Sequence, residues 1–315
     1  LENHFKQYKE VLVLLGARQV GKTTILKKIF PSAQYLSVDS EPVREVFDCY
    51  DPMAYKQILK PDVDYVVIDE IHKLSDPGRA AKIFYDQIPE YKLIITGSSA
   101  FNIKNKASES LAGRKIEYHL YPLTFSEYLV QKGIVNNFSN LFVDKFSLNN
   151  VYSFDMQSIL DNVLIYGLYP ETLSRPSDPV YLQNLVDSVV FKDLLDLRLI
   201  ENRVGALNLL RLLAHQIGSL VNYSELSKRL SMDVKTISRY IDLFEQSFIL
   251  YKLLPYSTKQ RDEIGKMPKI YFYDLGLRNA LVENFQSIQN RPDSGQLFEN
   301  FIISEILKTN YYGSF

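Results

Sequence analysis

The chain of 315 residues contains very little cysteine and no tryptophan. Its one cysteine, Cys49, cannot close an intrachain disulfide, and no second thiol is present for a metal site or a redox pair. Folds stabilised by internal disulfides or by clusters of cysteine around a metal are therefore excluded. This composition fits a reducing compartment, and we expect the protein to be cytoplasmic.

Long apolar runs and a strong net charge are also absent. No stretch reaches the 18 consecutive apolar residues of a membrane-spanning helix, and the opening segment LENHFKQYKE lacks the apolar core of a signal peptide. We therefore expect no association with a membrane. The formal net charge is −1, so no global field would draw the protein to nucleic acid, and any such contact must come from a local patch.

What is present is typical of a globular protein with two domains, or one large domain with an appendage. Hydrophobic residues make up 46% of the chain and charged residues 23%, which is close to the average for soluble proteins. In the first third, short apolar runs alternate with segments long enough for helices. This alternation predicts an α/β fold with a doubly wound parallel sheet, whose strands would cover residues 11–15, 33–38, 65–69, 92–96 and 116–123.

A phosphate-binding pattern follows the first predicted strand. The string GARQVGKT at 16–23 fits G-x-x-x-x-G-K-[ST] and precedes the helical segment TILKKIF, which is the context that this motif requires. Its backbone N–H groups and the positive end of the helix would face the phosphates. We predict that Lys22 contacts the β and γ phosphates and that Thr23 ligates Mg²⁺. The predicted nucleotide-binding residues are Gly16, Ala17, Arg18, Gln19, Val20, Gly21, Lys22, Thr23 and Thr24.

Two acids stand at the end of the buried strand YVVIDE. Asp69 is predicted to hold Mg²⁺ through water, and Glu70 is predicted to activate the attacking water as a general base. The alternative is that Glu70 only caps the next turn. The following strand ends in TGSS, where Ser98 would donate to the γ-phosphate or the water, or else would cap a helix. No N-K-x-D string is present to read guanine, so ATP is favoured over GTP.

Several strings occur in an order that resembles a known family. GARQVGKTT, DEIHK, TGSS, LAGR at 111–114 and PLTFSEY at 122–128 are similar to the core of prokaryotic ATPases of the AAA superfamily. Downstream, YGLYPE, KIYFYDLGLRNAL and GQLFENFIISEIL resemble the companion domain of those proteins, although Tyr166 stands where a second glycine is expected. The resemblance implies an ATPase core, a winged-helix element and a module similar to restriction-endonuclease-like nucleases.

Four regions follow from this reading. Residues 1–125 would form the ATPase core and residues 126–217 a helical lid or linker. The winged-helix domain would occupy 218–290, with a first helix near 224–230 and a second near 234–247. Residues 291–315 would be only the first helix of the nuclease-like module, packed through Leu297, Phe298, Phe301 and Ile302.

Two further interpretations concern charged residues. Arg114 of LAGR is a candidate to neutralise charge on the γ-phosphate, in its own subunit or in a neighbour of a homo-oligomer, and the alternative is a surface arginine that orders a loop. Lys235 and Arg239 would face outward from the second helix of the winged element. Residues 223–273 carry nine Lys or Arg against six Asp or Glu, so any DNA binding should be weak and sequence-tolerant.

These features predict Mg²⁺-dependent binding and hydrolysis of ATP, coupled to a conformational change of the winged-helix region, which contacts either DNA or protein. An alternative is a switch that binds ATP, turns it over little and selects a protein partner. A third reading, a DNA-binding regulator, is disfavoured by the weak positive surplus. Cleavage of DNA is not expected, because Glu299 and Glu305 point in different directions on one helix and cannot share a metal.

Overall fold

The computed structural model describes residues 1–97, 111–135, 156–188, 200–256 and 267–313. The chain forms two compact units, Leu1–Leu120 and Tyr121–Phe315. No helix within these described ranges is long and apolar enough to cross a membrane.

The first unit is built on a parallel sheet of five strands, as predicted. The strand order is β2-β3-β4-β1-β5, and every neighbouring pair is parallel. All five residues of β1 are buried, which explains why its sequence is apolar throughout. The strands are β1 (Val11–Leu15), β2 (Gln34–Ser37), β3 (Tyr65–Asp69), β4 (Lys92–Gly97) and β5 (Lys115–His119).

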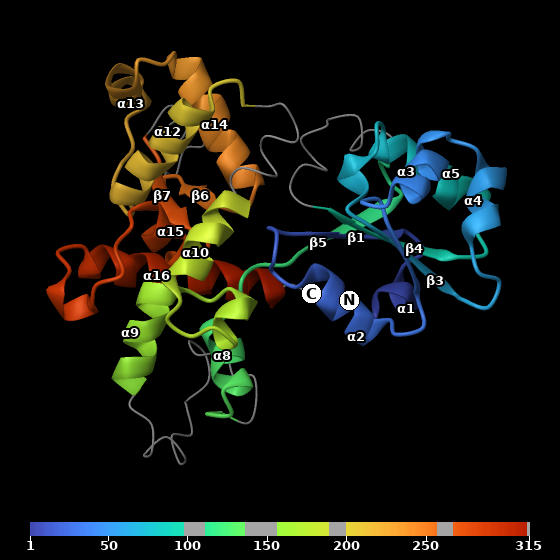
Figure 1. Cartoon of the computed structure of the whole chain (residues 1–315), viewed down its shortest axis with the longest axis horizontal. Coiled ribbons are helices and arrows are strands. Elements are labelled where there is room, and N and C mark those ends of the chain that lie inside the picture. The colour runs from blue at the N-terminus through green and yellow to red at the C-terminus, as the bar shows by residue number, and fades with distance from the viewer. Residues whose placement is uncertain (98–110, 136–155, 189–199, 257–266, 314–315) are drawn as a thin grey trace. The chain divides into compact units, whose positions relative to one another are not determined.

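Helices cover both faces of this sheet (Figure 1). From β1 the chain passes over β4 and β3 to β2, and it then returns across the sheet to β5. Because parallel crossovers are right-handed, reversing the direction moves the connecting helices to the opposite face. One face carries α1 (His4–Gln7) and α2 (Lys22–Ile29). The other carries α3 (Glu41–Asp48), α4 (Pro52–Ile58) and α5 (Pro77–Gln87), and the short helix η1 (Ile71–Lys73) follows β3.

The face under α2 contains a compact apolar core. Leu12 and Leu14 of β1 pack against Leu26 and Phe30 of the α2 segment, and all four side chains are buried. This core fixes the direction in which α2 leaves the loop after β1. The loop is thus held between two elements that are anchored by apolar contacts.

The second unit is mostly helical. In chain order it contains α8 (Phe125–Gln131), α9 (Met156–Tyr166), η3 (Pro170–Leu173), α10 (Pro179–Val186), α12 (Arg203–His215), α13 (Tyr223–Leu230), α14 (Val234–Gln246), β6 (Leu250–Leu253), β7 (Lys269–Phe272), α15 (Leu275–Leu281), η6 (Ile288–Asn290) and α16 (Ser294–Tyr312).

Helices α13 and α14 lie within one residue of the two predicted helices. Side chains of Asn222 and Asp233 cap their amino ends, and Ile237, Ile241 and Phe244 are buried as their helical spacing predicts. After α14, strands β6 and β7 form an antiparallel pair, and Leu220 adds a bridge to β7.

Helix α16 packs within the second unit, but its buried face is more polar than predicted. Leu297 and Phe301 are buried, whereas Phe298 is 47% exposed, so its predicted place in the packed stripe was wrong. The positions that turn inward instead are Asn300, Ser304, Glu305 and Lys308. Each of these four polar side chains makes a hydrogen bond within the unit, which compensates for its removal from water.

Candidate functional site

The loop between β1 and α2 has the backbone that a phosphate cradle needs. Gln19 and Gly21 have positive φ angles of 62° and 93°, so the chain curls just before α2 begins at Lys22. A Cβ atom on Gly16 would lie 2.3 Å from the carbonyl oxygen of Leu120, which leaves no room for a side chain there. Both glycines of the motif are therefore required by geometry.

The side chain of Lys22, the first residue of α2, turns back toward this loop. It is 6% exposed, and its Nζ donates to the carbonyl oxygens of Gly16 and Ala17, each at 3.0 Å. The first turn of α2 contains no acidic residue, so the partial positive charge of the helix end is not neutralised by its own sequence. The predicted phosphate segment thus combines one ammonium group with the positive end of a helix.

The two predicted magnesium ligands are already in contact. Thr23 Oγ1 donates to Asp69 Oδ2 at 2.9 Å, although 46 residues separate them in the sequence. Thr96, at the end of β4, donates to the other carboxylate oxygen of Asp69. Burial, together with the charge of Asp69, raises the pKa of Tyr35 to about 12, so that phenol stays neutral beside the carboxylate.

Glu70 follows Asp69 in an unusual backbone conformation. Its φ of 59° is left-handed, and its N–H donates to Thr96 Oγ1 at 3.1 Å. Its Oε2 is buried and lies 3.5 Å from Nδ1 of His72, the middle residue of η1. Thr96 and His72 were not among the predicted site residues. The signal for Thr96 is its place beside β3, because the register that pairs Ile68 with Ile95 puts the next residues of both strands side by side.

The remaining predicted residues of the phosphate loop and the β4 end differ in how exposed they are, and one of them is outside the described residues. Ser98 lies outside the described residues. Within the motif, Ala17 and Val20 are buried, whereas Gln19 and Thr24 are exposed. Arg18 is half-buried.

Arg114 is not brought to this edge of the sheet. It directly precedes β5, at the end of the strand opposite the phosphate loop, and its Nε is 2.9 Å from Asp86 Oδ1.

The donor set fits a magnesium nucleotide better than a metal held by protein alone. No group of three or more His, Cys, Asp or Glu residues in the described ranges could hold a metal ion. Mg²⁺ usually keeps several waters and binds to one or two protein oxygens together with substrate phosphates. Thr23, which follows Lys22 in the sequence, and Asp69 are in contact with each other, and their side chains supply oxygens of that kind.

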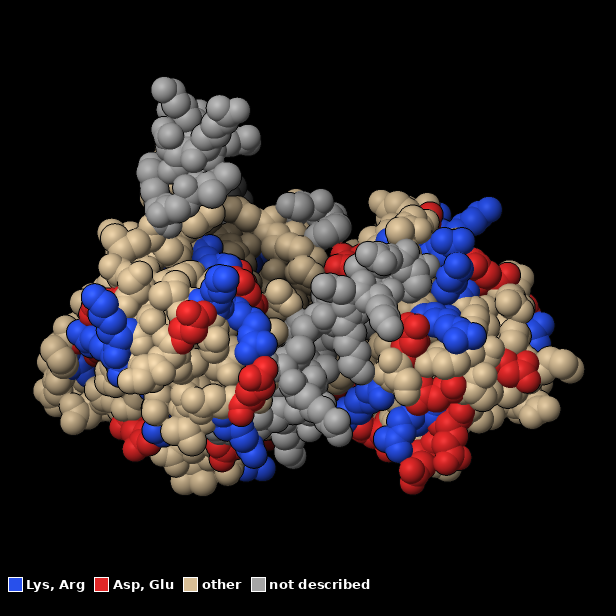
Figure 2. Space-filling view, turned by 90° about the horizontal axis from the view of Figure 1, so that it is seen from above, with Lys and Arg blue, Asp and Glu red and all other residues tan. Residues whose placement is uncertain are grey.

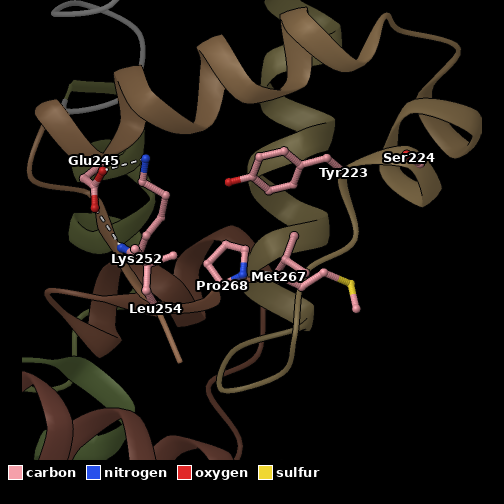
Figure 3. A pocket seen from close by; sticks show the side chains of 8 residues that line it. Tyr223, Ser224, Glu245, Lys252, Leu254, Met267 and Pro268 are labelled. Carbon is pink, nitrogen blue, oxygen red and sulfur yellow. Dashed lines mark hydrogen bonds and ion pairs between the residues drawn. The ribbon is translucent and has the colours of Figure 1, made fainter. Parts of the chain in front are cut away.

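A separate cavity of about 570 Å³ lies in the second unit, between α13, α14 and the β6–β7 pair (Figure 3). Lys252 points toward Glu245 in this cavity and also pairs with Asp242, and the three charges are partly buried. Although burial lowers the pKa of Lys252, these hydrogen bonds raise it to about 12. The cavity is lined by Val221, Tyr223, Ser224, Glu245, Lys252, Leu254, Met267 and Pro268.

The face predicted to contact DNA is electrically mixed. Arg239 lies 3.7 Å from Glu201, and Arg229 lies 2.9 Å from Glu225. Basic and acidic side chains lie close to one another over the face seen in Figure 2. A surface of this kind gives little of the counterion release on which non-specific DNA affinity depends.

The two acids considered for cleavage chemistry lie apart and are both bound to other groups. Glu299 accepts from Tyr271 Oη at 2.6 Å and from Lys269 Nζ at 3.1 Å. Glu305 is buried and accepts from the N–H of Phe125. The prediction that they point in different directions is confirmed.

Comparisons with known proteins divide the chain in a similar way. Residues 8–129 match a family of AAA domains, and residues 157–288 match a domain of unknown function. The first match supports a P-loop, AAA-type nucleotide-binding domain built around the loop, strand ends and sheet described above. The second match spans the boundary predicted at residue 217.

Similar full-length proteins are uncharacterised. One from Methanocaldococcus jannaschii is 27% identical over 93% of this chain and 67% of its own length. Another, from Haemophilus influenzae, is 26% identical over 98% of this chain and 76% of its own length. One from Mycobacterium tuberculosis is 25% identical, with coverage of 94% and 62%.

A solved structure of a signal-transduction ATPase with a tetratricopeptide repeat sensor, from Pyrococcus horikoshii, aligns with 98% of this chain and 44% of that one. The TM-score is 0.34 and the sequence identity is 11%.

Proposed function

We propose that the protein binds Mg²⁺-ATP at the edge of the sheet where β1, β3 and β4 end, and that it hydrolyses the γ-phosphate there. The observation that carries this proposal is the convergence of residues from three strand ends. Lys22 lies in the phosphate loop, Thr23 bonds to Asp69, and Thr96 joins Asp69 to the backbone of Glu70. Ligands bind at this edge in open α/β sheets.

The roles of the residues follow from their chemistry. Lys22 and the amino end of α2 would neutralise phosphate charge, and the Gly16–Gly21 backbone would wrap around it. Thr23 and Asp69 would hold Mg²⁺, which supplies charge neutralisation at the phosphates when bound. Glu70 would accept the proton of the attacking water. Ser98 and Arg114 stay in this proposal as candidates for contacts to the γ-phosphate, with Arg114 acting from a neighbouring subunit.

A switch that binds ATP without turnover is the second candidate. Such a protein needs the phosphate loop and the magnesium ligands but has no use for a carboxylate after Asp69. Glu70 is held there by a strained backbone and by the hydroxyl of Thr96, and these contacts favour turnover.

We further propose that the bound nucleotide changes the conformation of the second unit, and that residues 218–290 act as a winged helix. The order of α12, a bridge at Leu220, α13, α14 and the β6–β7 pair supports that assignment. The mixed charge of its surface favours contact with protein over contact with DNA. Binding of DNA through Lys235 and Arg239 would then be weak.

The test is steady-state hydrolysis of Mg²⁺-ATP by the purified chain, with and without duplex DNA, beside Lys22→Ala. Glu90→Gln is a matched control, because that acid precedes β4 at the opposite edge of the sheet. We expect turnover that Lys22→Ala removes through lost affinity and that Glu90→Gln retains. Equal binding by Lys22→Ala would show that the assigned site is wrong, and tight binding with no turnover would favour the switch. Size-exclusion chromatography in each nucleotide state tests whether the protein assembles into oligomers. Mixing Arg114→Ala with Lys22→Ala tests whether Arg114 of one subunit acts at the site of its neighbour.

A further inference from the structure

We infer that His72 is a positioning residue for Glu70, and that it determines which oxygen of that carboxylate faces the reacting water. This inference rests on the proposed hydrolysis at the same site. It adds to the site a residue that lies three positions after Asp69, in the short helix η1 that follows the strand ending at Asp69.

The contact is buried. The side chain of His72 is 5% exposed and that of Glu70 is 19% exposed. Nδ1 of the ring and Oε2 of the carboxylate are themselves removed from solvent and face each other at 3.5 Å. A proton on Nδ1 is the tautomer that an adjacent carboxylate favours, so the ring would donate and Glu70 would accept. Hydrogen bonds of catalytic groups are often long without substrate and shorten when it binds.

The surroundings leave the ring little freedom to move. Residues Ile71 and Leu74, on either side of His72 and Lys73, are fully buried, and η1 packs against β4 and α5. The backbone of Glu70 is held by Thr96 on the opposite side. Thr96 therefore holds the backbone N–H of Glu70, and His72 lies against its carboxylate, so both ends of the residue are positioned.

A glutamate acts as a base on one particular water only if neighbouring groups fix the orientation of its carboxylate. Its long side chain loses rotamer freedom when it is ordered, and an unheld carboxylate would spend most of its time in other rotamers. Enzymes commonly orient a base through a third group for this reason. With Oε2 directed at His72, only Oε1 is left to accept a proton from water.

Three variants of the full chain test the inference. His72→Leu removes the donor, and we expect kcat to fall about 10- to 100-fold, the scale of a misplaced catalytic group, while KM and the Kd for ATP stay within about twofold. His72→Asn keeps an N–H donor close to the position of Nδ1, and we expect it to recover most of the rate. His4→Leu is the matched control, because His4 is another buried histidine of this unit that bonds to Glu10 and Tyr118 instead. It should change stability without changing kcat.

A double-mutant cycle separates positioning from packing. In a Glu70→Gln background, His72→Leu should lower the residual rate no further, because the group that it positions is already gone. An equal fold-loss in both backgrounds, or an unchanged kcat in His72→Leu alone, would overturn the inference while leaving the proposed ATPase intact. If wild-type protein shows no turnover that depends on Lys22, the proposed function itself fails. If His72→Leu does not fold, His72→Phe, which keeps a ring but has no N–H donor, replaces it in both Glu70 backgrounds and is judged by the same criterion.

Discussion

The polar residues of the two units are brought together in different ways. In the first unit, Lys22, Asp69 and Thr96 each follow or end a parallel strand, so the sheet places them at one edge. In the second unit, side chains of α16 reach back to the chain around residues 121–125, about 180 residues earlier. Tyr312, Lys308 and Glu305 bond there to the backbone of Tyr121, Leu123 and Phe125.

This difference determines how much of each arrangement can be deduced from the sequence. Parallel strands in one sheet end at the same side whatever their side chains are, so a motif at a strand end has a known location. Helices of the second unit have no such rule, and a polar contact there depends on how each helix is rotated and packed. The second unit also depends more on buried polar groups. Asp274, for example, accepts from the N–H groups of Leu168 and Leu277, and burial raises its pKa.

The largest expected effect concerns the first unit. Glu70→Gln should keep ATP affinity and lower turnover by about 10²–10⁴, because the amide cannot accept the proton of water. Steady-state kinetics together with a binding isotherm for ATP measure this, and Glu90→Gln serves as the control. Normal turnover in Glu70→Gln would mean that another group is the base. The position of a carboxylate at the end of a strand would then not be enough to identify the general base.

The second prediction tests the buried ion pair of α16. Lys308 and Glu305 are each 1% exposed and 3.2 Å apart, and Lys308 also donates to the carbonyl of Leu123. Lys308→Met leaves a buried carboxylate without its cation, so it should lower the free energy of unfolding by about 3–5 kcal/mol. Urea denaturation measures this. The exposed Lys228→Met is the control and should change stability by less than about 0.5 kcal/mol. Similar values for both would show that the α16 contacts contribute little.

The third prediction concerns the contact between Gly167 of the string YGLYPE and Asp274 of the string KIYFYDLGLRNAL. Gly167 has a φ of 75°, and a Cβ there would lie 2.3 Å from Asp274 Oδ1. Gly167→Ala should therefore destabilise the protein by about 2–4 kcal/mol, through backbone strain and a clash with a buried carboxylate. Gly295→Ala, on α16 with open space around it, should be neutral or slightly stabilising. Thermal melts of both variants decide, and equal shifts would contradict the close packing around Asp274.

The fourth prediction is a pH dependence. Hydrogen bonds from Arg291, and then from Arg278, hold the pKa of Asp293 well below its usual value. An acid with a lowered folded-state pKa stabilises the protein above its unfolded pKa of about 3.9, and this contribution is lost as the pH falls through the folded value. The stability difference between wild type and Asp293→Asn should be constant between pH 5 and 7, and should shrink below about pH 4. A difference that grows on acidification would contradict these contacts.

The smallest effect is expected for DNA. Lys235→Glu with Arg239→Glu should remove whatever weak affinity the protein has, and the wild-type salt dependence should correspond to only a few phosphate contacts at about −0.9 each. Fluorescence anisotropy with duplex DNA over a range of salt measures both. Arg211→Glu, which reverses a charge on α12 that pairs with Glu283, is a control for net charge. Tight binding that survives the double substitution would place a DNA surface elsewhere.

Element boundaries show the limit of prediction most clearly. The apolar run at 116–123 predicted a strand of eight residues, but β5 ends at His119. Tyr121 stacks on Tyr273, and its N–H bonds to Tyr312, so from Tyr121 onward the chain has partners within the second unit instead of a neighbouring strand. Local propensity carries no information about such partners, which lie more than 150 residues away.

By itself, the sequence determined the parallel sheet, the phosphate loop with Lys22, and the placing of Asp69 and Glu70 beside it. These follow from short apolar strands, whose ends share an edge, and from glycines that a tight loop requires. Only the tertiary structure decided that Thr96 and His72 join those acids, that Arg114 lies at the opposite edge, and that α16 turns polar side chains inward. The reason is physical, because these contacts depend on strand order, register and helix rotation, which arise from the packing of the whole core.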